Sequence, residues 1–209
     1  MSTVSLVDNY FLPSSSFETR KYPLIPLRIK IEKNINKFAD IIGTIAAVLL
    51  LALLVNVFYD VIMRYLFNDV SIGMQELEWH LYASIFLLGI SYTLKENAHV
   101  RVDVIYEHLN PKKQAIIDIS GTLFFLLPFC LLIAYYGIGF AEEAYSLGES
   151  SGDPGGLPHR WIIKSMISLS FVFVIITSIG FMLRAFNRAV DAEQEESKQN
   201  KNNNTGESA

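Results

Sequence analysis

The stretch that decides the fold is residues 41–63, IIGTIAAVLLLALLVNVFYDVIM. It carries no charged residue before Asp60, and a helix of this length spans the hydrocarbon core of a bilayer, about 30 Å. Its apolar residues surround the helix instead of lining one face, unlike those of an amphipathic surface helix. We therefore expect a transmembrane helix here.

Three further apolar blocks follow, at residues 77–94, 115–144 and 162–186. Each is about 18 residues or longer, which is enough to cross a membrane as a helix. The sequence lacks the ten-residue alternating segments of a transmembrane β-barrel. These blocks predict an all-α integral membrane protein with four transmembrane helices and a membrane domain over residues 40–186.

Composition excludes several other classes of protein. The chain has 209 residues, 51% of them hydrophobic and 18% charged, and a net charge of −4. It has no basic field for nucleic acid. The single cysteine, Cys130, excludes an internal disulfide, a CxxC thiol oxidase and a cysteine-based zinc site.

Lysine and arginine set the expected topology. Six precede the first span, four lie between the second and third spans, and four lie in or near the C-terminal tail. The other two connections hold only Arg64 and Arg160. The positive-inside rule then places both termini in the cytoplasm.

The segments outside the spans differ in character. Residues 1–27 contain three prolines and a serine run, so they read as a mobile arm. Residues 28–39, RIKIEKNINKFA, have apolar positions at helical spacing and predict a short interfacial amphipathic helix. The tail, 187–209, is too polar to bury a core and is expected to be disordered. Pro128 is expected to kink the third span.

Few polar groups lie within the spans. Asn56 is the deepest, and helix–helix hydrogen bonding is a better interpretation of it than substrate binding. Asp60 and Arg64 are spaced to pair on one helix. Gly43 and Ala47 form a small-residue pair that could seat a neighbouring helix, and Gly89 is a further packing candidate.

The histidines do not suit a cofactor. His80 and His159 lie near the outer ends of the spans, whereas His99 and His108 lie in the cytoplasmic connection. A bis-histidine haem needs ligands from facing helices at one depth. We therefore expect no haem, no metal site and no enzymatic activity.

An ordered series of motifs is more specific. RYLFN (64–68) closes the first span, QELEW (75–79) opens the second, FLLG (86–89) lies within it, and KENAHVRVD (95–103) follows it. This series resembles the small membrane subunit of TRAP transporters (tripartite ATP-independent periplasmic transporters, DctQ type). The third connection, residues 149–158 and the Arg160-Trp161 pair, resembles a subgroup labelled for mannitol or chloroaromatic compounds.

The resemblance implies a location and a set of partners. The location is the bacterial inner membrane. The partners would be a separate large multi-span permease, a periplasmic substrate-binding protein and the lipid bilayer. The small subunit would support sodium-coupled uptake of an organic acid or similar anion without holding the main substrate site.

The resemblance also suggests site residues. An outer-rim cluster would fix the first hairpin and meet the permease or the binding protein, although the same residues could simply be solvated. Its members are Arg64, Asn68, Glu76, Glu78 and Trp79. In the cytoplasmic connection, His99 and Asp103 are further candidates, with Asp103 better interpreted as a helix cap.

Two other classes of function stay open. A self-sufficient four-helix transporter would need a carboxylate at the centre of a span, and Asp60 lies near an end. A membrane anchor of a redox enzyme would need haem ligands, which the histidine positions disfavour.

Overall fold

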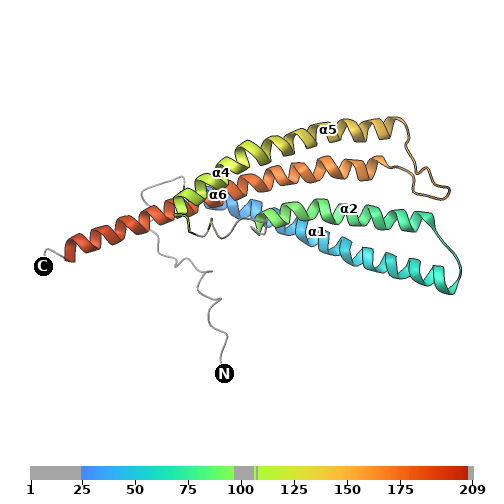
Figure 1. Cartoon of the computed structure of the whole chain (residues 1–209), viewed down its shortest axis with the longest axis horizontal. Coiled ribbons are helices and arrows are strands. Elements are labelled where there is room, and N and C mark those ends of the chain that lie inside the picture. The colour runs from blue at the N-terminus through green and yellow to red at the C-terminus, as the bar shows by residue number, and fades with distance from the viewer. Residues whose placement is uncertain (1–24, 97–105, 107, 207–209) are drawn as a thin grey trace, which may run out of the picture.

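The computed structural model describes residues 25–96, 106 and 108–206, and the regular elements in those ranges are all helical. Figure 1 shows the arrangement. The elements are α1 (Ile25–Leu66), α2 (Ile72–Lys95), α4 (Pro111–Gly121), the π-helix η2 (Thr122–Leu126), α5 (Leu127–Ser146) and α6 (Trp161–Gly206).

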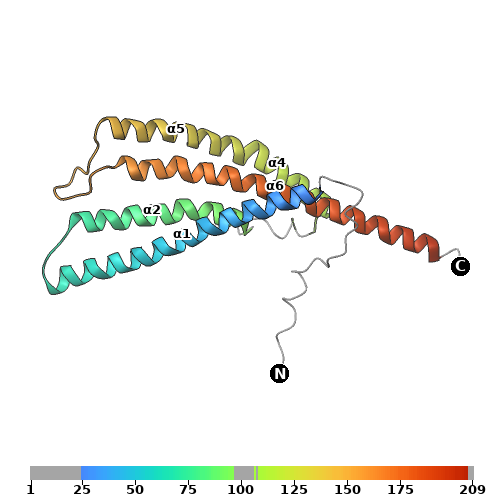
Figure 2. The same cartoon turned by 180° about the vertical axis from the view of Figure 1, so that it is seen from behind.

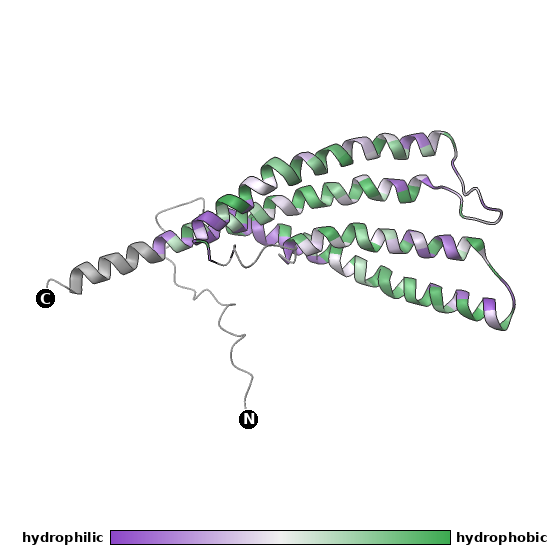
Figure 3. Cartoon of the chain, viewed as in Figure 1, coloured by the Kyte–Doolittle hydropathy of each residue, from purple (hydrophilic) through white to green (hydrophobic). Residues whose placement is uncertain are grey.

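The helices form two antiparallel hairpins, α1 with α2 and α5 with α6, which are joined because α2 packs on α6. The hairpins diverge toward the connections at residues 67–71 and 147–160, which we call the loop end (Figures 1 and 2). At the opposite end, which we call the junction end, α1 and α4 cross α6. Between these two more polar ends, the helices are mainly hydrophobic (Figure 3).

Three helical stretches in the described chain are long and apolar enough to cross a membrane: Arg28–Leu66, Pro111–Ser146 and Trp161–Gln194. They contain the first, third and fourth expected spans. The second expected span lies within α2, whose 24 residues give a length of about 36 Å. Glu78 and His80 make the first turns of α2 more polar, so α2 is less apolar than the other three.

The third span accommodates Pro128 by widening one turn of the helix. Residues Thr122–Leu126 are π-helical, and the N–H of Leu127 bonds to the carbonyl of Thr122. Proline has no N–H and clashes with the carbonyl four residues earlier, and a π-turn relieves both problems. The kink expected at Pro128 therefore takes the form of a π-helical insertion just before it.

The helix bounds differ from two expectations. Residues 28–39 are helical, and they run without a break into the first span as part of α1. The tail, whose composition predicts disorder, is helical through Gly206. Both differences have one cause, because extending an existing packed helix avoids the cost of nucleation. Alanine, glutamate, glutamine and lysine in the tail also favour the helix.

Candidate functional site

Glu76 organises the loop end. Its side chain accepts hydrogen bonds from the hydroxyl of Ser151 and from the backbone N–H of Leu157, the latter at 2.6 Å. Arg160 lies 4.0 Å from the same carboxylate. The hydrogen bonds from Ser151 and Leu157, helped by the charges of Arg160 and His80, outweigh desolvation and hold the pKa of Glu76 below its usual value. Glu76 therefore binds loop 147–160 as a carboxylate.

Glycine permits this close approach. A Cβ at Gly156 would lie 2.4 Å from the side chain of Ser151 and 2.9 Å from Oε2 of Glu76. A Cβ at Gly73, in the first turn of α2, would lie 3.2 Å from the carbonyl oxygen of Gly155. The glycines of the loop thus let its backbone lie directly on the start of α2.

Asn68 ends the first helix. Its φ of 53° lies in the left-handed region, where asparagine is among the most tolerated residues after glycine. The N–H groups of Phe67 and Asp69 both bond to the carbonyl of Met63, at 3.2 and 3.1 Å, and close the end of the helix. The side chain of Ser71 then accepts a bond from the N–H of Met74 and caps α2. Asn68 thus has a structural role in the turn between the helices.

A polar stripe on α1 faces the start of α2. Asn56 is buried and donates to the carbonyl of Met74 at 3.0 Å, which links the two helices. The buried Asp60 pairs with Arg64 at 2.5 Å, which confirms the predicted pairing. Two buried atoms in this region, Nε of Arg64 and Oε1 of Glu78, have no hydrogen-bond partner within the described chain.

Several residues on the outward face of α2 are exposed in the described chain. Trp79 is 73% exposed, and Tyr82 and Phe86 are also exposed. A Cβ at Gly89 would meet no atom within 4 Å. Since these residues follow one another at three- and four-residue steps, they form one stripe, which we call the α2 stripe (Trp79, Tyr82, Phe86 and Gly89).

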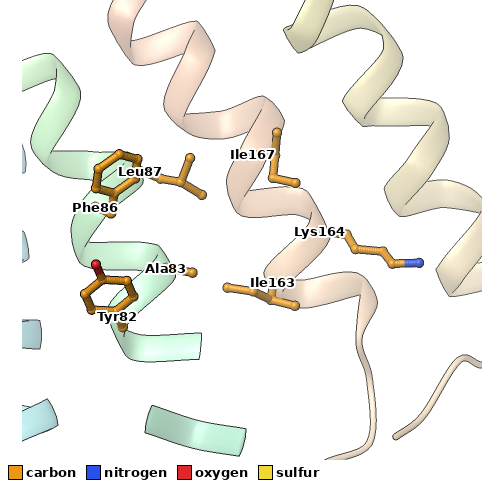
Figure 4. Close-up of a pocket in the computed structure, with 7 residues that line it drawn as sticks. All are labelled: Tyr82, Ala83, Phe86, Leu87, Ile163, Lys164 and Ile167. Atoms are coloured by element: carbon orange, nitrogen blue, oxygen red, sulfur yellow. The ribbon is translucent and has the colours of Figure 1, made fainter. Parts of the chain in front are cut away.

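An apolar groove of about 380 Å³ lies beside this stripe, between α2 and α6. Figure 4 shows Leu87 and Ile163 in the space between the two helices. Lys164 points away from α2, pairs with Glu149 and lies 4.0 Å from the ring centre of Phe140. The groove is therefore lined by apolar side chains from both hairpins: Tyr82, Ala83, Phe86, Leu87, Ile163 and Ile167, with the stem of Lys164.

The small-residue candidates on α1 differ from each other. A Cβ at Gly43 would lie 2.5 Å from the ring of Tyr92, so the first hairpin is closely packed there. Ala47 is exposed. Gly43 thus lies on the inner face of α1, whereas Ala47 is turned outward.

The junction end holds a polar network that the sequence analysis missed. Arg184 of α6 donates to the carbonyl of Lys95 at 2.6 Å and to Asn36 at 2.9 Å, and its Nε lies 3.5 Å from Glu32. Asn187 also bonds to Glu32, at 2.9 Å. The spacing of these residues could have predicted the network. Glu32 and Asn36 lie four residues apart on one face of α1, and Arg184 and Asn187 lie three residues apart on one face of α6.

Two further links close the junction. Lys95 pairs with Asp40 at 2.5 Å. Desolvation opposes the charge on Lys95, but hydrogen bonds to Asp40 and Glu96 outweigh it and raise the pKa of Lys95. The buried Asp118 of α4 accepts from Tyr106 at 2.7 Å and pairs with Arg188 at 3.3 Å. Charged contacts thus hold α1, α2, α4 and α6 together.

Two predicted site residues, His99 and Asp103, lie outside the described residues. Within the described chain, no three histidine, cysteine, aspartate or glutamate side chains gather into a possible metal site. The polar groups instead connect helices at both ends of long apolar rods. This arrangement defines a class, a helical multi-pass membrane protein whose polar side chains mainly fix its own architecture.

Comparison with known proteins identifies the family. Residues 53–188 match the family model of the DctQ component of tripartite ATP-independent periplasmic transporters, so the chain belongs to that family. Two relatives from Haemophilus influenzae carry the name TRAP transporter small permease protein. One is 30% identical over 152 residues, covering 72% of this chain and 92% of the relative. The other is 24% identical over 155 residues, covering 72% and 88%.

The chain is therefore a TRAP transporter small permease subunit, a transport component and not an enzyme. A tripartite system implies two partners, a large permease and a periplasmic binding protein. The family match begins at residue 53 and excludes the first part of α1, including Glu32 and Asn36.

Proposed function

We propose that this subunit packs against a separate large permease and supports sodium-coupled uptake of an organic acid or similar anion. It does so with four membrane spans and both termini in the cytoplasm. The family membership supports the transport role. The resemblance of the motif series and of residues 149–161 supports the substrate class and the coupling ion.

The observation that carries this proposal is the amount of apolar surface the chain leaves uncovered. In the most apolar windows of α1 and of α4–α5, only 17% of the residues are buried within the chain. Exposed phenylalanines such as Phe125 in η2 and Phe129 in α5 extend this surface along the third span. A helix surface of this kind is stable only against lipid or another membrane protein.

The α2 stripe is the proposed binding surface for a helix of the large permease. Helices in membranes associate through close van der Waals packing, which small residues permit. Gly89 offers open space on the outward face of α2, and the exposed Phe86 lies one turn before it. The adjacent groove between α2 and α6 could take a side chain from the permease helix. Phe86 and Gly89 also belong to the motif series that resembles the family pattern.

The outer-rim residues have a second proposed role. The buried Nε of Arg64 and Oε1 of Glu78 each lack a hydrogen-bond partner within the described chain. An unsatisfied buried polar group is costly. Since neither atom is accessible in the chain alone, we infer that contact with the permease or the binding protein at the outer face turns these side chains so that both atoms are paired. Glu76, in contrast, is satisfied by loop 147–160 and acts by shaping that surface.

Two experiments test the proposal. A tag on the C-terminal tail should recover one larger polytopic membrane protein in equal amount from native membranes. Gly89→Leu should abolish that recovery, whereas Gly139→Leu, on an exposed face of α5 with open space, should not. If the chain is recovered alone and transports a solute when it is reconstituted in liposomes, the subunit role is refuted. That result would favour the self-sufficient transporter.

Topology is tested with the single cysteine replaced. In a Cys130→Ser background, Ser2→Cys, Ser150→Cys and Ser208→Cys variants are each treated with a membrane-impermeant maleimide in intact spheroplasts. Ser150 is exposed in loop 147–160. The proposed topology predicts labelling at position 150 only. Labelling at position 2 or 208 would overturn the cytoplasmic placement of that terminus.

A further inference from the structure

The first turns of α1 carry a row of exposed lysines with no ion-pair partner among the described residues. Lys30, Lys33 and Lys37 are exposed, and none of them makes an ion pair with another described residue. They lie at three- and four-residue steps, so their side chains share one face of the helix over about 10 Å. We call these three residues the lysine ridge.

The rotation of α1 is fixed by its opposite face. Glu32 and Asn36 contact Arg184 of α6, and a Cβ at Gly180 of α6 would lie 2.7 Å from Ile35. The ring of Phe38 packs edge-on against Phe173 at 5.3 Å. Since these contacts bind one face of α1 to α6, the lysine ridge is held outward.

The same outward face changes character one turn beyond Lys37. Ile41, Ile45 and Val48 are 51%, 44% and 59% exposed. At 100° per residue, they lie within about 120° of the lysine ridge around the helix. About 6 Å of helix rise separates Lys37 from Ile41. One uncovered surface thus passes from three cationic groups to a mainly apolar strip, in which Thr44 is the exposed polar residue.

We propose that the lysine ridge and this strip bind an anionic phospholipid. The ammonium groups would contact its phosphate, and Ile41, Ile45 and Val48 would contact its acyl chains. The order of charged and apolar groups matches the order of headgroup and hydrocarbon in a leaflet. Lysines close to such a surface attract anionic lipid, and salt screens the attraction. This inference does not depend on the permease-binding role of the α2 stripe.

Native mass spectrometry of the full chain tests this inference, both alone and in the complex recovered with the large permease. The detergent contains equal amounts of phosphatidylglycerol and phosphatidylcholine with identical acyl chains. The wild-type chain should retain phosphatidylglycerol preferentially. The Lys30→Gln/Lys33→Gln/Lys37→Gln variant should lose at least about tenfold of that preference, since each lysine near an anionic surface contributes about fivefold. Raising the salt concentration should weaken the wild-type preference.

Two control variants distinguish an effect of the lysine ridge from an effect of net charge. Lys113→Gln/Lys198→Gln/Lys201→Gln removes the same three charges elsewhere and should keep the preference. Lys30→Arg/Lys33→Arg/Lys37→Arg should also keep the preference. Equal lipid retention by the ridge and control variants would overturn the proposal. So would a ridge variant that keeps lipid selectivity but no longer recovers the large permease, because the lysines would then contact protein.

Discussion

Glu76 and Leu157 are 81 residues apart in the chain, yet the carboxylate of Glu76 accepts the backbone N–H of Leu157 at 2.6 Å. This bond joins the first hairpin to the second at the end where the helices diverge. Farther along the helices, α2 and α6 hold the hairpins together through apolar contacts such as that of Leu88 with Met166. Glu76 thus fixes the shape of loop 147–160, the surface that the proposed topology presents outside the membrane.

Replacing Glu76 should release this loop. Glu76→Ala removes the acceptor for both Ser151 and Leu157, and Glu76→Gln weakens both bonds because a carboxylate accepts more strongly than an amide. We expect faster proteolytic cleavage within residues 147–160 for both variants, and more for alanine. Glu143→Gln, an exposed residue of α5, is the control. Wild-type cleavage rates in Glu76→Ala would contradict the clamp.

Acid should loosen the same contact. Because the pKa of Glu76 is lowered in the folded chain, its contribution is fully present above pH 4.5, the usual value, and is lost as pH falls through the lowered folded value. Hydrogen exchange at the N–H of Leu157, corrected for its intrinsic pH dependence, should therefore lose protection only below pH 4.5. Loss of protection between pH 7 and 5 would be inconsistent with this sign. At neutral pH the loop is expected to stay closed.

The junction should depend on Arg184 more than on any single lysine. Removing its guanidinium takes away the donor to the carbonyl of Lys95 and leaves Glu32 with Asn187 as its donor. Arg184→Gln should lower the free energy of unfolding by about 1–3 kcal/mol, measured in an SDS titration. A double-mutant cycle with Glu32→Gln should show positive coupling, because the two side chains are in contact. Additive effects would exclude the pairing.

The spans were the most predictable part of the fold, because uninterrupted apolar sequence has few stable solutions other than a membrane helix. The apolar pattern could not predict where the helices begin and end. The Lys-rich start of α1 and the Glu-rich end of α6 are helical because they continue packed helices. Glu76 could be singled out through the motif resemblance, but its partners could not, since Ser151 and Leu157 lie in an irregular loop. Likewise, Asn68 could be singled out because it belongs to the RYLFN motif, and the structure explains its presence there by its left-handed backbone conformation.

Two glycines should respond oppositely to alanine. At Gly43 the new Cβ would lie 2.5 Å from the ring of Tyr92, so α1 and α2 must separate or the ring must move. Overpacking of this kind costs about 1–3 kcal/mol, and Gly43→Ala should lower the thermal midpoint of the purified chain. Gly89→Ala meets open space and should leave that midpoint unchanged or slightly raised. Equal destabilisation by both would contradict the packing of the first hairpin.

Asn68 tests whether a motif residue acts through the turn or through a partner. Glycine reaches a φ of 53° without strain, whereas a β-branched residue pays about 1–2 kcal/mol. Asn68→Gly should therefore keep wild-type stability and wild-type recovery of the large permease, while Asn68→Val should lower both. If Asn68→Gly folds normally but fails to recover the permease, the amide itself contacts the partner and the backbone explanation is wrong. The comparison works because glycine keeps the backbone geometry while it removes every side-chain contact.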